Sequence, residues 1–180
     1  MKITIANRQR LYRIDRAAIL CLVRFLLQKA FADPCAAWRD VRLLLTDDAG
    51  MAECNRRSMH HEGPTDVITL HYAPVPGTGG AAAELVVNLQ RASEEGRLRR
   101  RTSGRKTLWD AQHELALYLA HGCDHLAGAE DDTAPDRRRM RRRELKWLGA
   151  ARLAGLLKIP LLSRPSSTTP STRRPRHGRV

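Results

Sequence analysis

Two histidines and an aspartate stand close together in the sequence, at a spacing that suits a metal ion. His121 and His125 are one helical turn apart and would lie on the same face of a helix. Gly128 follows three residues later and can take the left-handed conformation that ends a helix, so the chain could turn back and bring Asp131 to the same metal. Three protein ligands leave one position for a water, which the metal would activate as a nucleophile. The spacing therefore predicts a hydrolase with one Zn²⁺ held by His121, His125 and Asp131.

The same spacing occurs in metzincin peptidases, which place a general-base glutamate directly after the first histidine. Gly122 occupies that position here. His113 and Glu114 look like the start of an HExxH motif, but Leu117 stands where its second histidine would be. Asp124 occupies the position of the glutamate in the HxxEH motif of inverzincins, and it could act as a base or hold a ligand; we interpret it as an exposed helix residue. A peptidase stays open as an alternative that lacks the usual base.

The charge of the chain favours a polyanionic partner. The 180 residues carry a formal net charge of +13, and an excess of this size promotes phosphate contacts through counterion release. The basic residues are clustered, whereas a plain solvated surface would need no clustering. The candidates for RNA contacts are Arg97, Arg99, Arg100, Arg101, Arg105, Lys106, Arg137, Arg138, Arg141 and Arg142.

Four short strands separated by helices must position these residues. Alternating and helical apolar patterns predict strands over 2–6, 41–45, 66–72 and 84–89 and helices over 15–32, 48–58 and 135–157. Helical segments are also predicted after residue 89, the strongest of them over 108–120. We expect an α/β (α+β) fold, with a single mixed four-stranded sheet packed against helices, in one domain over residues 1–158. Residues 159–180 are rich in Ser, Thr, Pro and Arg and are predicted to form a disordered basic tail.

The sequence favours a cytoplasmic protein. No run of about 18 apolar residues is present, so we expect no membrane helix, and the first residues lack the apolar run of a secretory signal. The four cysteines show no CxxC spacing and are predicted to be reduced core thiols: Cys21, Cys35, Cys54 and Cys123.

The segment from His121 to Asp131 resembles the YbeY family of bacterial ribosomal-RNA maturation factors, whose usual motif is HGxLHLxGYDH. Three further stretches are similar to the family in the correct order, so that the resemblance covers roughly residues 40–150. They are Asn55-Arg56 followed by Pro64-Thr65-Asp66-Val67-Ile68-Thr69, which resembles LNxxYRxxDxPTDVLSF; Glu84-Leu85-Val86-Val87, which resembles the GDIVI strand; and Met140, Glu144 and Leu148 in the closing helix. Glu114 also matches an acidic position in the metal-bearing helix.

The resemblance implies a zinc-dependent single-strand endoribonuclease with a mixed sheet and a metal at the mouth of a basic cleft. It implies a role in maturing the 3′ end of small-subunit (16S) ribosomal RNA and in ribosome quality control, with the small ribosomal subunit as partner. Several positions depart from the usual motifs of the family, and three of them bear on the chemistry. Asp131 replaces a histidine, Asp124 replaces a leucine, and Met59 replaces an arginine that would contact a phosphate. Arg57, His60 or His61 could substitute for that arginine, although the two histidines are more typical of a loop surface.

Two questions stay open at this point. Asp66 could orient a metal-ligating histidine or could only stabilise the turn before its strand. The chain could also be a ribosome-binding assembly factor with little nuclease activity, which the basic tail and Met59 would suit.

Overall fold

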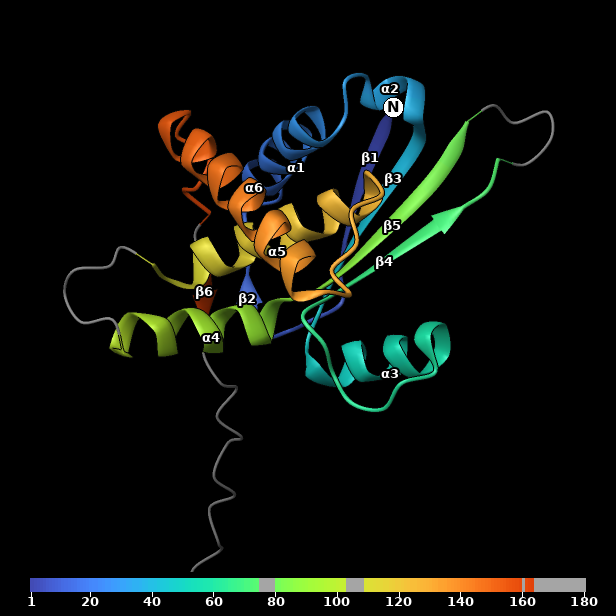
Figure 1. Ribbon diagram of the computed structural model, residues 1–180. Helices are drawn as coiled ribbons and strands as arrows, with labels where there is room; N and C mark the ends of the chain where they lie inside the picture. The colour runs from blue at the N-terminus through green and yellow to red at the C-terminus, as the bar shows by residue number, and fades with distance from the viewer. Residues whose placement is uncertain (75–79, 103–108, 160, 164–180) are drawn as a thin grey trace, which may run out of the picture.

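The computed structural model describes residues 1–74, 80–102, 109–159 and 161–163. Its centre is a mixed four-stranded sheet in the order β1-β3-β5-β4 (Figure 1). The strands are β1 (Lys2–Asn7), β3 (Trp38–Thr46), β5 (Ala81–Asn88) and β4 (Val67–Tyr72). β1 and β5 run parallel to β3, and β4 runs antiparallel to β5 at the edge of the sheet. The predicted α/β (α+β) class with one mixed four-stranded sheet is confirmed.

Helices cover both faces of this sheet. On one face, α5 (Ala111–Leu126) packs against β4 and β5, with α1 (Arg16–Ala30) and α6 (Ala134–Leu153) packed against α5 in turn (Figure 1). On the other face lies α3 (Asp48–Met59). Because successive strand residues point to opposite faces, Leu85 joins the large core around α5, whereas Val86 joins a smaller cluster with Met51 of α3.

Side-chain caps explain where these helices begin. Asp15 accepts a hydrogen bond from the Ala18 backbone N–H, as predicted for the start of α1. Asp110 accepts from the backbone N–H groups of Gln112 and His113 and so starts α5. Each carboxylate satisfies N–H groups that have no partner within the helix.

Helix α4 (Leu89–Thr102) follows β5 directly and lies beside the start of α5. Gly96 makes this close approach possible, because a Cβ at this position would lie 2.5 Å from the Ala111 nitrogen and from the Asp110 carbonyl carbon. A side chain there would push α4 away from the helix that carries the two histidines.

Several elements were missed or misplaced by the sequence patterns. The short α2 (Pro34–Ala37) and the pair formed by β2 (Tyr12–Arg13) and β6 (Leu162–Ser163) are too short for periodicity to reveal. Helix α6 ends at Leu153 rather than near 157, since the chain turns at Gly155 with φ of +73°.

The end of the described chain is tied to the core. Ile159 is buried, and its backbone N–H donates to the Gln112 side-chain oxygen. The predicted tail of 159–180 lies mostly outside the described residues, so both the tail and the domain boundary stay predictions. None of the described helices is both long and apolar enough to cross a lipid bilayer.

The cysteine prediction is wrong in part. All four thiols are free, and Cys123 is buried in the core as expected. Cys21 and Cys35, however, are exposed, and Cys54 is half-buried. Cys21 lies on the outer face of α1, whose buried stripe runs through Ile19, Leu22 and Val23.

Candidate metal centre

Helix α5 presents His121 and His125 side by side, with one nitrogen of each ring already engaged. His121 Nδ1 lies 2.6 Å from Glu144 Oε1, and His125 Nδ1 lies 2.8 Å from the Ala129 carbonyl oxygen. A carbonyl oxygen can only accept, so His125 must carry its proton on Nδ1. The same tautomer at His121 donates to the carboxylate of Glu144. Both Nε2 lone pairs are then available for a metal.

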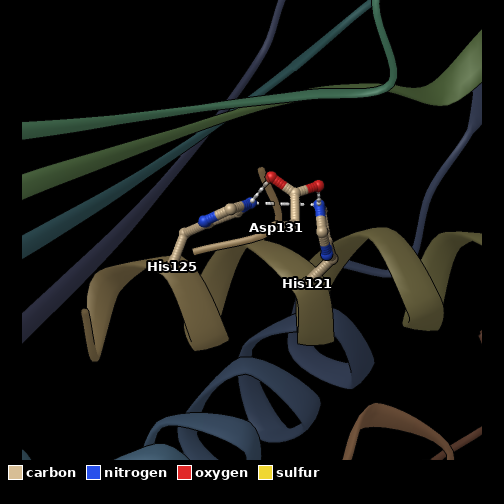
Figure 2. Close-up of side chains that lie close together, drawn as sticks. All are labelled: His121, His125 and Asp131. Carbon is tan, nitrogen blue, oxygen red and sulfur yellow. Dashed lines mark hydrogen bonds and ion pairs between the residues drawn. The ribbon is translucent and has the colours of Figure 1, made fainter. Parts of the chain in front are cut away.

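The three predicted ligands converge on one point (Figure 2). The two Nε2 atoms are 3.1 Å apart, His121 Nε2 is 3.9 Å from Asp131 Oδ2, and His125 Nε2 is 4.0 Å from Asp131 Oδ1. Ligand atoms at about 2.0–2.1 Å from a tetrahedral zinc are separated by roughly 3.3 Å. The group of His121, His125 and Asp131 could therefore hold one metal ion with little movement.

A glycine turn brings Asp131 back toward the helix, as the spacing predicted. Gly128 has φ of +83°, and its N–H donates to the His125 carbonyl. The Arg137 guanidinium then donates to the backbone carbonyls of Asp131 and Asp132 at 2.8 Å each. The third ligand is thus braced by α6 as well as by the turn.

Glu144 is the functional candidate that residue spacing did not single out. It is 1% exposed and comes from α6, so only the packing of α6 against α5 reveals its contact with His121. Burial lowers the pKa of His121, but the hydrogen bond and charge of Glu144, together with Asp66 and Asp131, outweigh burial and raise that pKa. A carboxylate on the far nitrogen of a ligating histidine fixes its tautomer and raises its basicity.

Gly122, in the position of a peptidase base, packs closely against the sheet. A Cβ there would lie 2.9 Å from Leu85 Cδ2 and 3.3 Å from Val67 Cγ2. A larger side chain at position 122 would therefore have to displace the side chains of Leu85 and Val67. The absence of a glutamate at this position argues against the metallopeptidase alternative.

The interpretation of Asp124 as an exposed residue is wrong. Its side chain is buried and receives two hydrogen bonds from Arg143 Nε, at 2.8 and 2.9 Å. Burial raises the pKa of Asp124, and the charge and hydrogen bonds of Arg143 oppose that rise. Asp124 lines a cavity between α1 and α6. It is not among the described residues that line the two cavities beside the metal centre. It joins α5 to α6 and is a poor candidate for a base.

Asp66 shows features of both predicted roles. Its Oδ1 accepts hydrogen bonds from the Val67 backbone N–H and from Thr65 Oγ1, which stabilises the turn into β4. It also lines the cavity next to His121, whose pKa its charge helps to raise. Its effect on the ligand is therefore electrostatic, across the cavity.

A cavity of about 360 Å³, called here the arginine cavity, opens beside the metal centre between α4, α5 and α6. Guanidinium groups and carboxylates share its lining. The lining residues are Asp66, Arg91, Glu95, Arg99, Glu114, Leu117, Tyr118, His121, Asp131, Arg137, Met140, Arg141 and Glu144.

The predicted RNA-binding residues are divided by the structure. Arg99, Arg137 and Arg141 line the arginine cavity, whereas Arg97 and Arg100 line a smaller one between α4 and the start of α5. Arg101, Arg138 and Arg142 are exposed, and Arg105 and Lys106 lie outside the described residues. The sequence clusters missed Arg91, because it stands apart from the basic runs.

A second cavity, of about 340 Å³ and called here the Met59 cavity, opens on the other side of the metal centre, between α3 and β4. Met59 and His61 both line it, next to His125 and Asp131. Of the residues considered as substitutes for the family arginine, Arg57 pairs with Glu53 at 2.5 Å, and His60 ends α3 in the left-handed conformation. His61 is thus the candidate that lies beside the metal centre.

Comparison with known proteins identifies relatives over most of the chain. The family model described as "Endoribonuclease YbeY" matches residues 4–152. A protein named endoribonuclease YbeY from Mycobacterium tuberculosis strain H37Rv is 31% identical over 146 residues, which cover 76% of this chain and 75% of that protein. Relatives of the same name from Anaeromyxobacter sp. strain Fw109-5 and Rhodopirellula baltica are each 32% identical and cover 64% and 67% of this chain. The match spans 56% of the length of each of these two proteins.

Proposed function

This chain belongs to the YbeY endoribonuclease family, and on that basis we propose that it is a zinc-dependent endoribonuclease acting on single-stranded RNA. One observation carries the proposal: three ligand atoms converge beside a cavity that several arginines line. A three-ligand centre leaves a coordination position open for chemistry. The adjacent guanidinium groups suit a phosphodiester substrate.

The roles of the protein side chains follow from their contacts. A zinc ion bound by His121, His125 and Asp131 would supply a Lewis acid and a water of lowered pKa. Glu144 holds His121 in the tautomer that presents Nε2 to the metal. The arginines would neutralise the negative charge of the phosphodiester and align it with the metal centre.

The cellular role that we propose is maturation of the 3′ end of 16S ribosomal RNA and ribosome quality control, in the cytoplasm, with the small ribosomal subunit as partner. Family membership and the net charge of +13 support it. Aromatic residues make up only 4% of the chain, which limits base stacking. RNA recognition should therefore depend on charge and shape more than on sequence.

Two variants test the proposal. Asp131→Ala should lower the zinc content of the purified protein, because only the two histidines of the three proposed ligands remain. His121→Ala should abolish cleavage of single-stranded RNA by the zinc-loaded preparation. If His121→Ala cleaves RNA as well as the unchanged protein does, the proposed mechanism is wrong.

Met59 favours one other function, that of an assembly factor with little nuclease activity. It is 44% exposed, lines the Met59 cavity and offers no charge to a phosphate. Binding to small-subunit precursors that survives zinc removal, with no RNA cleavage under any metal, would support this alternative. A peptidase is tested by casein hydrolysis, which we do not expect because position 122 carries no glutamate.

A further inference from the structure

The two cavities that flank the metal centre differ in their cationic side chains, whereas carboxylates line both of them. Arg91 and Arg99 of α4 and Arg137 and Arg141 of α6 converge on the arginine cavity. Among the described residues, those that line the Met59 cavity include neither Lys nor Arg. An incoming phosphodiester chain therefore meets cationic donors on one side of the metal only.

The guanidinium groups on that side are anchored and still accessible. Arg99 Nε lies 3.2 Å from Glu114, Arg141 Nη1 lies 3.4 Å from Glu144, and Arg91 Nη1 donates to the Pro64 carbonyl at 3.1 Å. The side chains of Arg99 and Arg141 remain 46% and 48% exposed. A guanidinium has five N–H donors, so each of these groups keeps donors for an anion.

We infer that the arginine cavity is the subsite for a phosphodiester adjacent to the one that is cleaved, with Arg91, Arg99 and Arg141 as its donors. The inference rests on the proposed nuclease function and adds to it the side on which the RNA backbone lies. The cavity shares His121 and Asp131 with the metal centre, so a phosphate bound there is next to the reacting group. Arg137 is left out of the donor set because it braces the backbone of Asp131.

A different explanation is that these arginines only neutralise the carboxylates around them. Glu114 and Glu144 are each 1% exposed and need cationic partners. That explanation predicts that the loss of one of these arginines lowers the stability of the protein. It also predicts that RNA affinity falls no further than it does when any other single surface charge is removed.

Binding and cleavage are measured separately to decide between these explanations. Binding uses zinc-loaded full-length protein and a short single-stranded RNA at several salt concentrations, over a time in which electrophoresis shows that the RNA stays intact. Arg141→Gln should raise Kd about tenfold, the usual effect of one charge-assisted hydrogen bond. It should also reduce the slope of log K against log salt by about 0.7, the value for one phosphate contact. Arg141→Lys keeps the charge and should recover part of the affinity.

Arg152→Gln is the matched control, since it removes the same charge from an exposed position on the same helix. It should change Kd by less than about twofold, because a distant surface charge is screened by salt. Arg91→Gln provides a second test, because the Arg91 side chain contacts a backbone carbonyl and does not contact Glu144, the partner of His121. This variant should weaken RNA binding as Arg141→Gln does. Equal Kd values and equal salt slopes for the Arg141, Arg91 and Arg152 variants would overturn the subsite.

Failure of the proposed function gives a different result. If the unchanged protein does not cleave unmodified RNA, the nuclease proposal fails. A selective loss of binding in Arg141→Gln and Arg91→Gln would still support the phosphate subsite in that case.

Discussion

At the scale of single residues, the contact between Glu144 and His121 makes the metal centre more than a set of three ligands. We expect Glu144→Gln to weaken zinc affinity by about 10- to 100-fold, because a neutral amide no longer supports the basicity of the ligating imidazole. Competition with a zinc chelator measures this change. Glu62→Gln, which removes a carboxylate from an exposed loop position, is the control. Equal affinities in the two variants would show that Glu144 does not tune the ligand.

Glu114 provides a pH-dependent prediction. It accepts a hydrogen bond from Trp109 Nε1 at 2.5 Å, and burial raises its pKa above the ordinary value of 4.5, although Trp109 and Arg99 oppose the rise. The folded protein therefore binds this proton more tightly than the unfolded chain does. Its contribution to stability is fully present below about pH 4.5 and is lost as the pH rises through the raised pKa.

Glu114→Gln should remove the loss of stability that accompanies ionisation of Glu114, and its side-chain oxygen still accepts from Trp109. The variant should therefore be more stable, relative to the unchanged protein, near neutral pH than in acid. Its free energy of unfolding minus that of the unchanged protein should be larger at neutral pH. Urea unfolding at the two pH values measures the difference. A relative stability that does not vary with pH would contradict this assignment of the raised pKa.

The convergence of His121, His125 and Asp131 was predictable because a helix repeat and a glycine define their geometry over a few residues. The contacts of Glu144 and Asp124 were not predictable, because each depends on how α6 packs against α5. Asp124 shows the difficulty well: a carboxylate on a helix is usually exposed, and only the nearby Arg143 makes its burial tolerable.

At the scale of elements, the approach of α4 to the start of α5 controls where the metal-bearing helix lies. Gly96→Ala should destabilise the fold by roughly 2–3 kcal/mol, since the new methyl group would meet backbone atoms that cannot move aside. Gly149→Ala on α6 is the matched control, because its Cβ would have nothing within 4 Å. There the better helix propensity of alanine should stabilise the protein by up to about 1 kcal/mol. Urea unfolding distinguishes the two, and a harmless Gly96→Ala would show that the helices can separate freely.

The longer elements were predictable from their patterns, and the short ones were not. The apolar stripe of α1 and the cap at Asp15 correctly predicted that helix. The two-residue strands β2 and β6 contain no repeat and form only because distant parts of the chain pair. Likewise, β3 and β5 extend beyond the predicted strands because Trp38 pairs with Ala81 across the sheet.

At the scale of the whole molecule, the fold should not depend on the metal. A large buried cluster joins the sheet to α1, α5 and α6, and Arg143 of α6 binds Asp124 of α5 without a metal. Removal of zinc with a chelator should abolish RNA cleavage and leave the far-ultraviolet circular dichroism spectrum unchanged. At free zinc about 100-fold above Kd, the metal should add at most about 2.7 kcal/mol to the free energy of unfolding. A large loss of helical signal on chelation would mean that the metal is structural.

The three ligands also have a consequence for how the protein acquires its metal. They all lie between residues 121 and 131, so even an unfolded chain can bring them together at a small cost in loop entropy. During synthesis they leave the ribosome before α6 and Glu144 do. A nascent chain could therefore capture zinc weakly and strengthen its hold only when α6 docks. Zinc that also binds the unfolded chain stabilises the folded state less than zinc that binds only the folded protein would.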